Sequence, residues 1–353
     1  MEEPITISTG SRLHFGLYAF GEGLPRQFGG VGAMVDVPIR VRVARLKTGV
    51  VGVKVDRNSM PQHGIAAQKF VDAWFDHQRR SGLSSGRLEL RDQIQVTVLQ
   101  APDHHVGLGL GTQLGLAISL GLFRAVENRE PSLIECATAV GRGLRSAVGT
   151  YGFFYGGLIV DQGKLPGEGV SPLQCRLAIP DSWRWVLMQM PLPPGLSGPN
   201  EKAAFERLGP MSAAQTQSLR SQITQRLLPA LEAKNFEEFS DSLYAYGRAA
   251  GECFAEIQGG PYRNQLLAEL VEQVRTFGVT GVGQSSWGPT LFALTRNEEE
   301  AETLTQHLKT SRFGKQGLAC EIVRSLNQGV MGPEGPEETK EETCRNSVSI
   351  STT

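Results

Sequence analysis

The feature that most constrains this chain is a glycine-rich loop that runs into an almost wholly apolar segment. Residues 107–127 read GLGLGTQLGLAISLGLFRAVE, and the positions after Thr112 are apolar on nearly every face of a helix. A helix that is hydrophobic all round has to be buried. The sequence therefore predicts a helix at the centre of a core, entered through a tight glycine turn.

The glycine turn has two interpretations. Its amides, together with the partial positive charge of a helix N-terminus, would form a phosphate site. Strand-to-helix turns of this kind are also common where no phosphate binds. The loop is not a Walker A motif, because no Lys-Ser/Thr pair follows it, and its glycines lack the dinucleotide-binding spacing.

The segments around this helix predict a sheet with helices. Residues 35–43 alternate between apolar and polar side chains, as in a half-buried strand, and Pro38 indicates an edge position or a bulge there. A helix is expected over 66–80, one strand or two over 88–99, and a strand over 157–161. Ser132 and Glu135 form a capping box that begins a helix.

The second half is richer in helix. A strand over 183–190 precedes helical stretches near 212–229, 233–257 and 262–277. A glycine loop and strand at 278–294, an acidic helix near 297–310 and a strand near 318–324 follow. The order predicts a mixed α+β fold with a boundary near 175–183. The polar tail from Met331 is expected to be disordered.

Composition excludes several classes of protein. The net charge of −1 gives no reason to expect nucleic acid or an acidic membrane surface as partner. No apolar stretch is long enough to span a bilayer, and the N-terminus has no signal-peptide pattern. The five cysteines form no C-x-x-C pair, which favours a cytoplasmic location.

Three further segments contain residue types that bind anions. Arg12 and His14 alternate with apolar residues and so share one strand face, near the backbone of FGGVG at 28–32. Residues 141–157 contain Arg142 and Arg145, and 281–288 form another glycine turn. Each also has a purely structural interpretation: a solvated strand face, a helix end followed by an aromatic core strand, and an ordinary turn.

Other chemistries are not supported. His104 and His105 are adjacent, which is poor geometry for a shared metal ion, and no zinc-binding spacing occurs. There is no G-x-S-x-G nucleophile elbow. Asp36 and Asp161 are candidate carboxylates for chemistry, but charged strand ends are the favoured interpretation.

The order of these motifs resembles a known family. PDHHVGLGLGTQ and GVTGVGQSSWGPTLFAL look like the second and third motifs of GHMP kinases. Together with SRLHFGL, FGGVG and GRGLRSAVGTYGFFYGGLIVDQG, they resemble the β-ribofuranosylaminobenzene 5′-phosphate synthases of that superfamily over residues 5–325. The resemblance implies a ribosomal protein S5 domain 2-like half (1–178), a ferredoxin-like half (179–328) and a tail (329–353).

The resemblance also implies a reaction. A ribosyl 5-phosphate group would pass from 5-phosphoribosyl 1-diphosphate to the ring carbon of 4-aminobenzoate or 4-hydroxybenzoate, releasing carbon dioxide and diphosphate. Mg²⁺ is the expected cofactor and tetrahydromethanopterin synthesis the expected pathway. A homodimer is compatible with relatives of this fold.

The resemblance assigns roles to residues by their motif positions. Arg142, Arg145 and Tyr151 are expected to be catalytic, and Thr112 to contact the metal ion. The expected substrate-binding residues are Arg12, His14, Gly29, Gly30, Ser146 and Thr150. The expected phosphate-binding residues are Gly107, Gly109, Gly111, Thr112, Gln113 and Gly283.

The chain departs from the kinase pattern at two places. Leu110-Gly111-Thr112 stands where kinases have a serine pair, and residues 147–151 contain no aspartate to act as base. An ATP-dependent small-molecule kinase is therefore the second hypothesis. A non-catalytic phosphate-ligand binder is the third.

Overall fold

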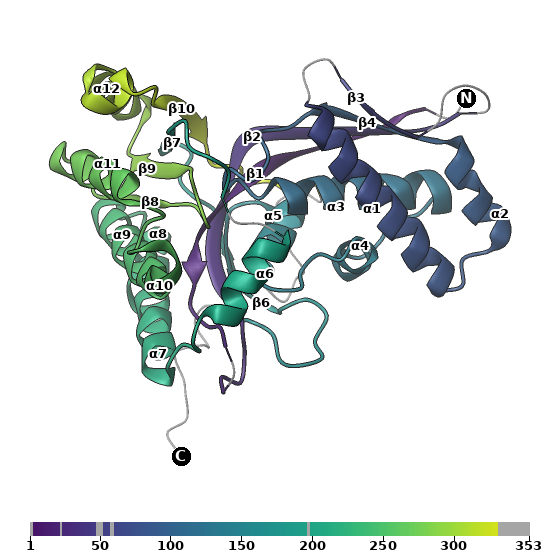
Figure 1. The fold of residues 1–353 in the computed structure, drawn as a ribbon, viewed down its shortest axis with the longest axis horizontal. Helices are drawn as coiled ribbons and strands as arrows, with labels where there is room; N and C mark the ends of the chain where they lie inside the picture. The colour runs from purple at the N-terminus through teal and green to yellow at the C-terminus, as the bar shows by residue number, and fades with distance from the viewer. Residues whose placement is uncertain (1–2, 22, 47–51, 57–59, 196–197, 331–353) are drawn as a thin grey trace.

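The computed structural model describes residues 3–21, 23–46, 52–56, 60–195 and 198–330. Two sheets organise this part of the chain, and they lie side by side with helices packed around them (Figure 1). The first has the order β3-β4-β2-β5-β6, with β1 paired to β2, and the second has the order β10-β7-β9-β8. The predicted α+β class is confirmed.

The first sheet is built on two long strands that run antiparallel through the middle of the molecule. Its strands are β1 (Ile5–Leu17), β2 (Gly30–Arg45), β3 (Gly52–Val55), β4 (Ile94–Gln100), β5 (Leu158–Asp161) and β6 (Leu173–Leu177). On one side β2 pairs with β1, and on the other it pairs with β5 and then β4. Pro38 is therefore not on an edge strand, and it lies where the β1–β2 register shifts, as the alternative of a bulge predicted.

The helices of the first half gather on one side of this sheet (Figure 1). They are α1 (Pro61–Arg80), α2 (Ser85–Leu88), the 3-10 turn η1 (Glu89–Gln93), α3 (Leu110–Leu122), the π-helical turn η2 (Phe123–Glu127), α4 (Leu133–Ala139) and α5 (Val148–Tyr155). The expected central helix is α3. Glycines let it approach its neighbours closely: a Cβ at Gly121 would lie 2.5 Å from Val43 of β2.

Two local expectations were wrong. Residues 88–93 were expected to be extended, but they form the end of α2 and η1, where Leu90 is buried. The aromatic segment 153–155 forms the end of α5 instead of a core strand. Gly149 and Gly152 explain this helix, because they bring it against Thr112 and Met34 with no side chain between.

The second sheet has a different neighbour on each face. Its strands are β7 (Arg184–Gln189), β8 (Val282–Gln284), β9 (Leu291–Thr295) and β10 (Ala319–Arg324). Along β7 the side chains alternate: Val186 and Met188 pack with α11 (Gln265–Thr276) and α12 (Glu298–Thr310), whereas Trp185 and Leu187 belong to a core shared with the first half. Alternate side chains of β7 therefore face two different cores. The second sheet lies between the helices α11 and α12 on one face and the first half of the molecule on the other.

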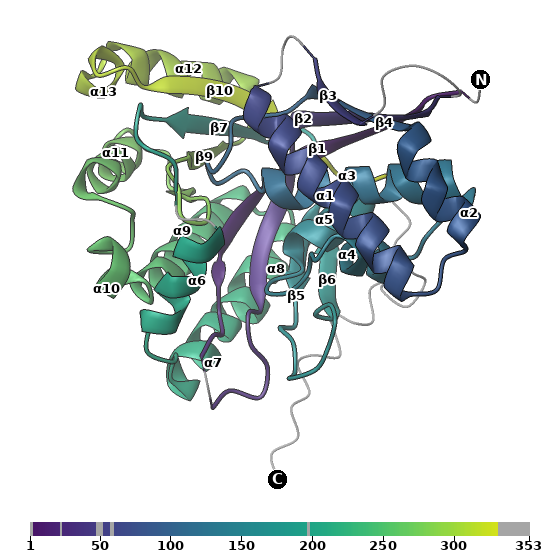
Figure 2. The same cartoon turned by 45° about the vertical axis from the view of Figure 1, so that its right-hand side comes forward.

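The remaining helices lie around this sheet and between the halves. They are α6 (Gly198–Arg207), α7 (Ala213–Gln222), the π-helical turn η3 (Ile223–Leu227), α8 (Leu228–Glu232), α9 (Phe236–Glu252), α10 (Ala255–Gln258) and α13 (Arg312–Lys315). Figure 2 shows α6 beside the long strands β1 and β2, close to α9. The sequence predicted the stretches that contain α7 to α11 but not α6.

The halves are joined through an aromatic contact and through the chain after β10. The ring of Phe15 lies 5.8 Å from that of Trp185 and 5.1 Å from that of Phe292. Leu326 N donates to Met34 O (2.9 Å), and Gly157 N donates to Leu326 O (2.8 Å). Aromatic packing and backbone hydrogen bonds therefore hold the two halves together.

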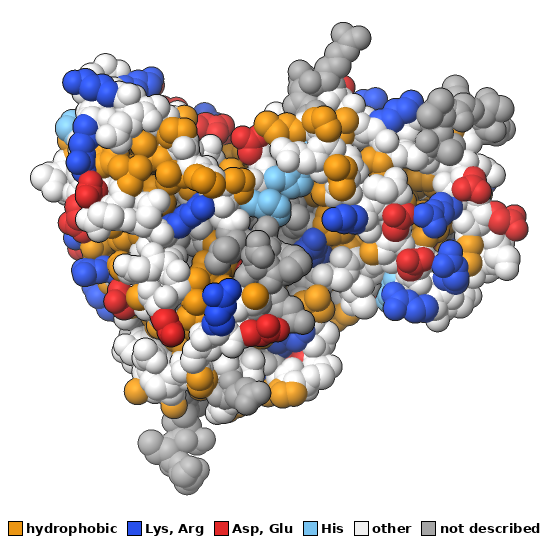
Figure 3. All heavy atoms as spheres, in the orientation of Figure 1, with side chains coloured by type: hydrophobic (Ala, Val, Ile, Leu, Met, Phe, Trp, Pro, Cys, Tyr) orange, Lys and Arg blue, Asp and Glu red, His pale blue; other side chains and the backbone are white. Residues whose placement is uncertain are grey.

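No helix within the described ranges is long and apolar enough to cross a membrane. Side chains of both charges are interspersed over the face drawn in Figure 3. The expected disordered tail from Met331 lies outside the described residues.

Candidate active site between the two halves

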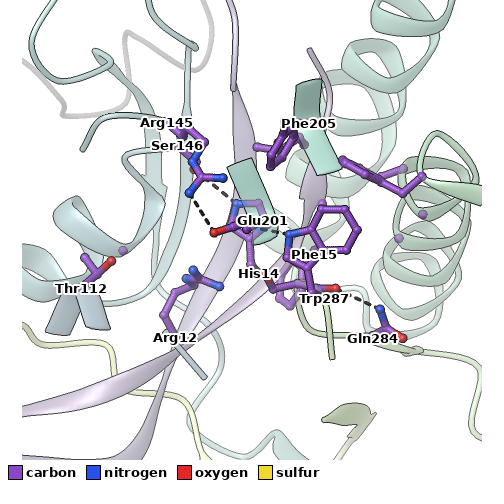
Figure 4. Close-up of a pocket in the computed structure, with 18 of the residues that line it drawn as sticks. Arg12, His14, Phe15, Thr112, Arg145, Ser146, Glu201, Phe205, Gln284 and Trp287 are labelled. Atoms are coloured by element: carbon purple, nitrogen blue, oxygen red, sulfur yellow. Dashed lines mark hydrogen bonds and ion pairs between the residues drawn. The ribbon is translucent and has the colours of Figure 1, made fainter. Parts of the chain in front are cut away.

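A cavity of about 290 Å³ opens between the two halves. Its walls come from β1, the start of α3, the loop before α5, α6, the end of α9 with the turn that follows, and the loop after β8 (Figure 4). Three segments that the sequence singled out meet here: the glycine loop that begins at Gly107, the strand with Arg12 and His14, and the turn at 281–288. Ser285 Oγ donates to Gly107 O (2.7 Å), and Ser286 N donates to His14 O (2.9 Å).

One wall of the cavity is cationic. Arg12, Arg142 and Arg145 line it. Nε and Nη1 of Arg12 and Nε of Arg142 are buried without a hydrogen-bond partner in the described structure. Burial lowers the pKa of Arg12 to about 10, and it also lowers that of Arg142, which Arg145 repels in addition. Unpaired buried donors are costly, so this wall is suited to an anion.

The cationic wall lies against the start of α3. Arg12 N donates to Leu108 O (2.9 Å), which fixes β1 to the glycine loop. Gly109 has φ +70°, and a Cβ there would be 3.2 Å from the Arg12 side chain. A Cβ at Gly111 would be 3.6 Å from Nη2 of Arg142. The helix N-terminus and two guanidinium groups therefore converge on one place.

The opposite wall is an aromatic slot formed by Phe205, Phe254 and Trp287. The ring centroids are 5.8 Å apart for Phe205–Phe254, 5.1 Å for Phe254–Trp287 and 5.8 Å for Phe205–Trp287. Gly247 and Gly251 present a side-chain-free stripe of α9 to the same cavity, four residues apart on one helix face. The three rings pack edge-to-face on one another, so the aromatic slot is an apolar wall against which a flat ring can lie.

A carboxylate stands between the two walls. Glu201 of α6 accepts from Arg145 Nη2 through Oε2 (2.8 Å) and from Trp287 Nε1 through Oε1 (3.1 Å). Arg145 also lies over the Phe205 ring, 5.2 Å from its centroid. Figure 4 shows Glu201 near the middle of the cavity, with Thr112 on one side and Phe15 and Trp287 on the other. One acidic residue thus connects the cationic wall to the slot.

A buried polar chain supports the cationic wall from behind. His14 Nε2 lies 3.3 Å from Ser146 Oγ, which donates to Asp161 Oδ2 (2.7 Å). Ala147 N, Gly163 N and Ser171 Oγ also donate to the Asp161 carboxyl group. Burial raises the pKa of Asp161 to about 6, whereas burial and then Arg12 hold that of His14 well below its usual value. His14 is therefore neutral.

Asp161 is the last residue of β5, as the interpretation of it as a strand end predicted, but it has a further role. The residue is fully buried, and it orders the start of α5 through the Ala147 amide. An aspartate that follows an apolar strand and precedes a glycine turn was a signal for such a role, because a buried carboxyl group needs nearby donors.

The structure brings some of the predicted site residues together. Those that line the cavity are Arg12, His14, Thr112, Arg142, Arg145 and Ser146. Gly109 and Gly111 lie directly behind the arginines, and a Cβ at Gly107 would meet Ser285 O at 2.5 Å. Gly30 contacts His14 and Ser146, whereas Gly29 packs on Tyr18.

Besides these five glycines, four more predicted site residues lie outside the cavity lining. Gln113 donates from Nε2 to Gly149 O (2.7 Å) and accepts from Thr9, so its amide is used inside the core. Tyr151 donates to Ser171 O (3.0 Å). Thr150 is buried, and Gly283 is packed under Phe292. Helix periodicity turns Gln113 and Thr150 into the core, which a linear motif does not reveal.

Sequence reasoning missed the slot and Glu201. α6 follows a proline-rich stretch and shows no clear apolar period, so nothing indicated that its residues face a ligand. Trp287 was part of a recognised glycine turn, but only the backbone of that turn was assigned a role. Phe254 follows α9 and was interpreted as part of a long helix.

The residues present fit a metal ion that arrives with its ligand better than one held by protein groups alone. No group of three His, Cys, Asp or Glu in the described ranges is placed to hold a metal ion. Thr112 lines the cavity beside the cationic wall. Mg²⁺ is commonly bound through substrate phosphates, waters and few protein ligands, and this donor set is compatible with that mode.

The sequence of this chain is similar to sequences of known proteins. The family described as GHMP kinases C terminal matches residues 227–313. The β-ribofuranosylphenol 5′-phosphate synthase of Archaeoglobus fulgidus is 26% identical over 347 residues, covering 92% of this chain and 98% of that protein. The Methanothermobacter thermautotrophicus protein of the same name is 27% identical over 303 residues, covering 82% and 88%.

This chain is similar in sequence to those synthases over most of its length. The predicted resemblance is confirmed, with relatives named for a phenol rather than an aminobenzene. Solved structures show the fold. Phosphomevalonate kinase of Streptococcus pneumoniae has a TM-score of 0.64 at 12% identity, covering 92% of this chain and 99% of that one. Galactokinase of Lactococcus lactis also has 0.64, at 13% identity and 93% and 95% coverage. The chain has the GHMP kinase fold.

Proposed function

We propose that this chain transfers a ribosyl 5-phosphate group from 5-phosphoribosyl 1-diphosphate to a ring carbon of 4-hydroxybenzoate or 4-aminobenzoate, with release of carbon dioxide and diphosphate. The observation that carries the proposal is a single cavity with two unlike walls. Arginine side chains, two of them with buried N–H groups that lack a partner, line the cavity together with the aromatic side chains Phe205, Phe254 and Trp287. The name of the relatives points to the same class of product.

The cationic wall would hold the donor. Diphosphate is the leaving group, and negative charge grows on its oxygens as the bond from ribose C1 breaks. Arg12, Arg142 and the amides at the start of α3 would stabilise that charge, because preorganised donors gain strength where water is excluded. Mg²⁺ would neutralise further charge on the diphosphate.

The aromatic slot would hold the acceptor. Its ring carbon that bears the carboxylate attacks ribose C1, while the electron pair of the C1–O bond leaves with diphosphate. Loss of carbon dioxide then returns the electron pair of the broken carbon–carbon bond to the ring. Phe205, Phe254 and Trp287 would orient the ring for attack, and orientation of this kind is a large part of catalysis.

An ATP-dependent kinase is the second candidate, because solved structures with this fold include kinases. A kinase needs a base for the proton of the accepting hydroxyl group. Among the described residues that line the cavity, Glu201 is the carboxylate, and Arg145 and Trp287 occupy both of its oxygens. This arrangement favours the transferase. The third candidate is a binder of phosphate ligands without turnover.

Carboxyl-labelled acceptor distinguishes these candidates. The protein is incubated with 5-phosphoribosyl 1-diphosphate, Mg²⁺ and one of the two acceptors, 4-hydroxybenzoate or 4-aminobenzoate, which carries carbon-14 in its carboxyl group. Release of labelled gas together with diphosphate supports the transferase, and omission of Mg²⁺ should stop it. ADP formation from ATP with an alcohol acceptor would support the kinase instead. If the ligand raises the thermal stability of the protein but neither reaction occurs, the third candidate, a binder without turnover, is supported.

The cellular role is part of the same proposal. The product would enter tetrahydromethanopterin synthesis in the cytoplasm and so serve one-carbon metabolism. Deletion of the gene should remove that coenzyme from cell extracts, and unchanged coenzyme levels would contradict the role.

A further inference from the structure

The Glu201 carboxylate occupies an anion site that the chain has built for itself. Its two oxygens receive hydrogen bonds from Arg145, in the loop before α5, and from Trp287, in the loop after β8. These donors come from opposite halves of the molecule, and the Glu201 side chain reaches them from a third segment, α6. Its side chain is only 22% exposed.

The surroundings of this pair match an aryl carboxylate rather than an alkyl one. Arg145 is stacked over Phe205, 5.2 Å from the ring centroid, and Trp287 lies edge-on to both Phe205 and Phe254. The donors therefore stand at the mouth of the aromatic slot. A carboxylate bonded to them would place its ring against the aromatic slot.

The charge balance of the cavity indicates that Glu201 can be replaced. Three arginines line it, and the negative charge of Glu201 partly offsets the charges of Arg12 and Arg142. Nε and Nη1 of Arg12 and Nε of Arg142 remain without partners in the described structure even so. Arg145 is already oriented towards a carboxylate by its bond to Glu201. An incoming anion would therefore have to displace only the Glu201 side chain.

We infer that Arg145 Nη2 and Trp287 Nε1 are the carboxylate subsite of the aromatic acceptor, and that Glu201 fills this subsite until the acceptor displaces it. The inference rests on the proposed function for the identity of the acceptor. It adds which groups recognise the carboxylate and which residue of the chain competes with it. Binding is an exchange of one carboxylate for another, with no change in the charge next to Arg145.

Direct binding tests this inference without the ribosyl donor. The probes are benzoate and, as a neutral ring of similar size, phenol. Trp287 provides the signal, because the other three tryptophans, Trp74, Trp183 and Trp185, are buried. Fluorescence quenching is measured for the wild type, Glu201→Gln, Arg145→Gln and the control Glu232→Gln, an exposed residue of α8 outside the cavity lining.

The expected pattern is selective for charge. Glu201→Gln should tighten benzoate binding by about tenfold, because one charge-assisted competitor is removed, and phenol binding should change little. Arg145→Gln should weaken benzoate by a similar factor and leave phenol alone. The Glu232→Gln variant should match the wild type for both probes.

Two results would overturn the inference. One is that Glu201→Gln weakens benzoate, or shifts benzoate and phenol alike, as expected of a residue that only holds α6 in place. The other is that inorganic phosphate gains more than benzoate, which assigns the subsite to the donor. If Glu201→Gln does not fold, Trp287→Phe, followed by calorimetry, should weaken benzoate alone. Because no turnover is involved, an inactive wild type would remove the proposed function but leave this binding pattern readable.

Discussion

Arg12 is expected to lower the folding stability of the protein while it raises the affinity for diphosphate. Its Nε and Nη1 are buried without partners in the described structure, a cost of about 1–3 kcal/mol per group. Arg12→Met keeps the length of the side chain and removes the charge. We expect its free energy of unfolding to rise by about 1 kcal/mol or more, while its affinity for magnesium diphosphate falls by about 30-fold.

Urea denaturation and calorimetric titration measure the two effects of Arg12→Met. The matched control is Arg87→Met, at an exposed position of α2, which should change neither quantity. A destabilised Arg12→Met protein that still binds diphosphate normally would contradict the assignment.

His14 predicts a pH effect. Burial, and then Arg12, depress the pKa of His14 below 6.5, so the unfolded chain binds a proton in a range where the folded chain does not. Stability contributed by neutral His14 is present above pH 6.5 and is lost as the pH falls below it. Between pH 7.5 and 5.5 we expect His14→Gln to lose about 1 kcal/mol less unfolding free energy than the wild type.

Urea denaturation at pH 7.5 and 5.5 measures this difference. His77→Gln, on the partly exposed side of α1, is the control and should follow the wild type. Equal losses in the wild type and His14→Gln would show that His14 does not titrate as described.

For single residues, the sequence predicts which residue types belong to the site better than it predicts where their side chains point. The alternation of Arg12 and His14 correctly placed both on one strand face, because strand geometry is strictly periodic. Gln113 and Thr150 belong to equally recognisable motifs, but helix packing turns them into the core. Glu201 had no motif at all, since its role comes from tertiary contacts with Arg145 and Trp287.

The turn that begins α3 is the element on which the donor site depends. Gly109 has φ +70°, and a Cβ there would press on Arg12 at 3.2 Å. Gly109→Ala should therefore cost about 1–2 kcal/mol of folding free energy for the left-handed backbone, and in addition it should displace Arg12 and weaken diphosphate binding by at least about tenfold.

Gly82→Ala is a close control for this change. Gly82 has φ +84°, and a Cβ there would meet nothing within 4 Å. The backbone cost should be similar in both variants, measured as a fall in the urea midpoint. Diphosphate affinity should fall only in Gly109→Ala, and equal affinities in the two variants would show that the turn does not position Arg12.

Elements with a strong period were predicted well, and short ones were not. The apolar run of α3 and the alternation in β2 each reflect burial that the hydrophobic pattern of the segment reports on its own. The helix α5 was missed because its glycines disfavour a helix locally. Those glycines are required by close packing on Thr112 and Met34, which is information that lies elsewhere in the chain.

For the whole molecule, the cavity exists because two sheets share one core. Trp185 and Leu187 on one face of β7 join the same buried cluster as Phe15 of β1. The other face of β7 packs on α11 and α12. The cationic wall and the aromatic slot thus belong to different halves that are held together by buried contacts, so loss of those contacts should unfold both halves at once.

Phe15→Ala tests this coupling. The Phe15 ring packs against both Trp185 and Phe292, and its removal should cost about 3–5 kcal/mol. Hydrogen exchange is followed separately for amides of α3, in the first half, and of α11, in the second. We expect protection to fall by the same free energy in both helices, because a shared core opens as one cooperative unit. The control Phe277→Ala, at a more exposed position at the end of α11, should cost far less. Protection lost in α3 alone would mean that the second half keeps its structure without the first, and that the walls of the cavity are joined more loosely than the contacts of Phe15 imply.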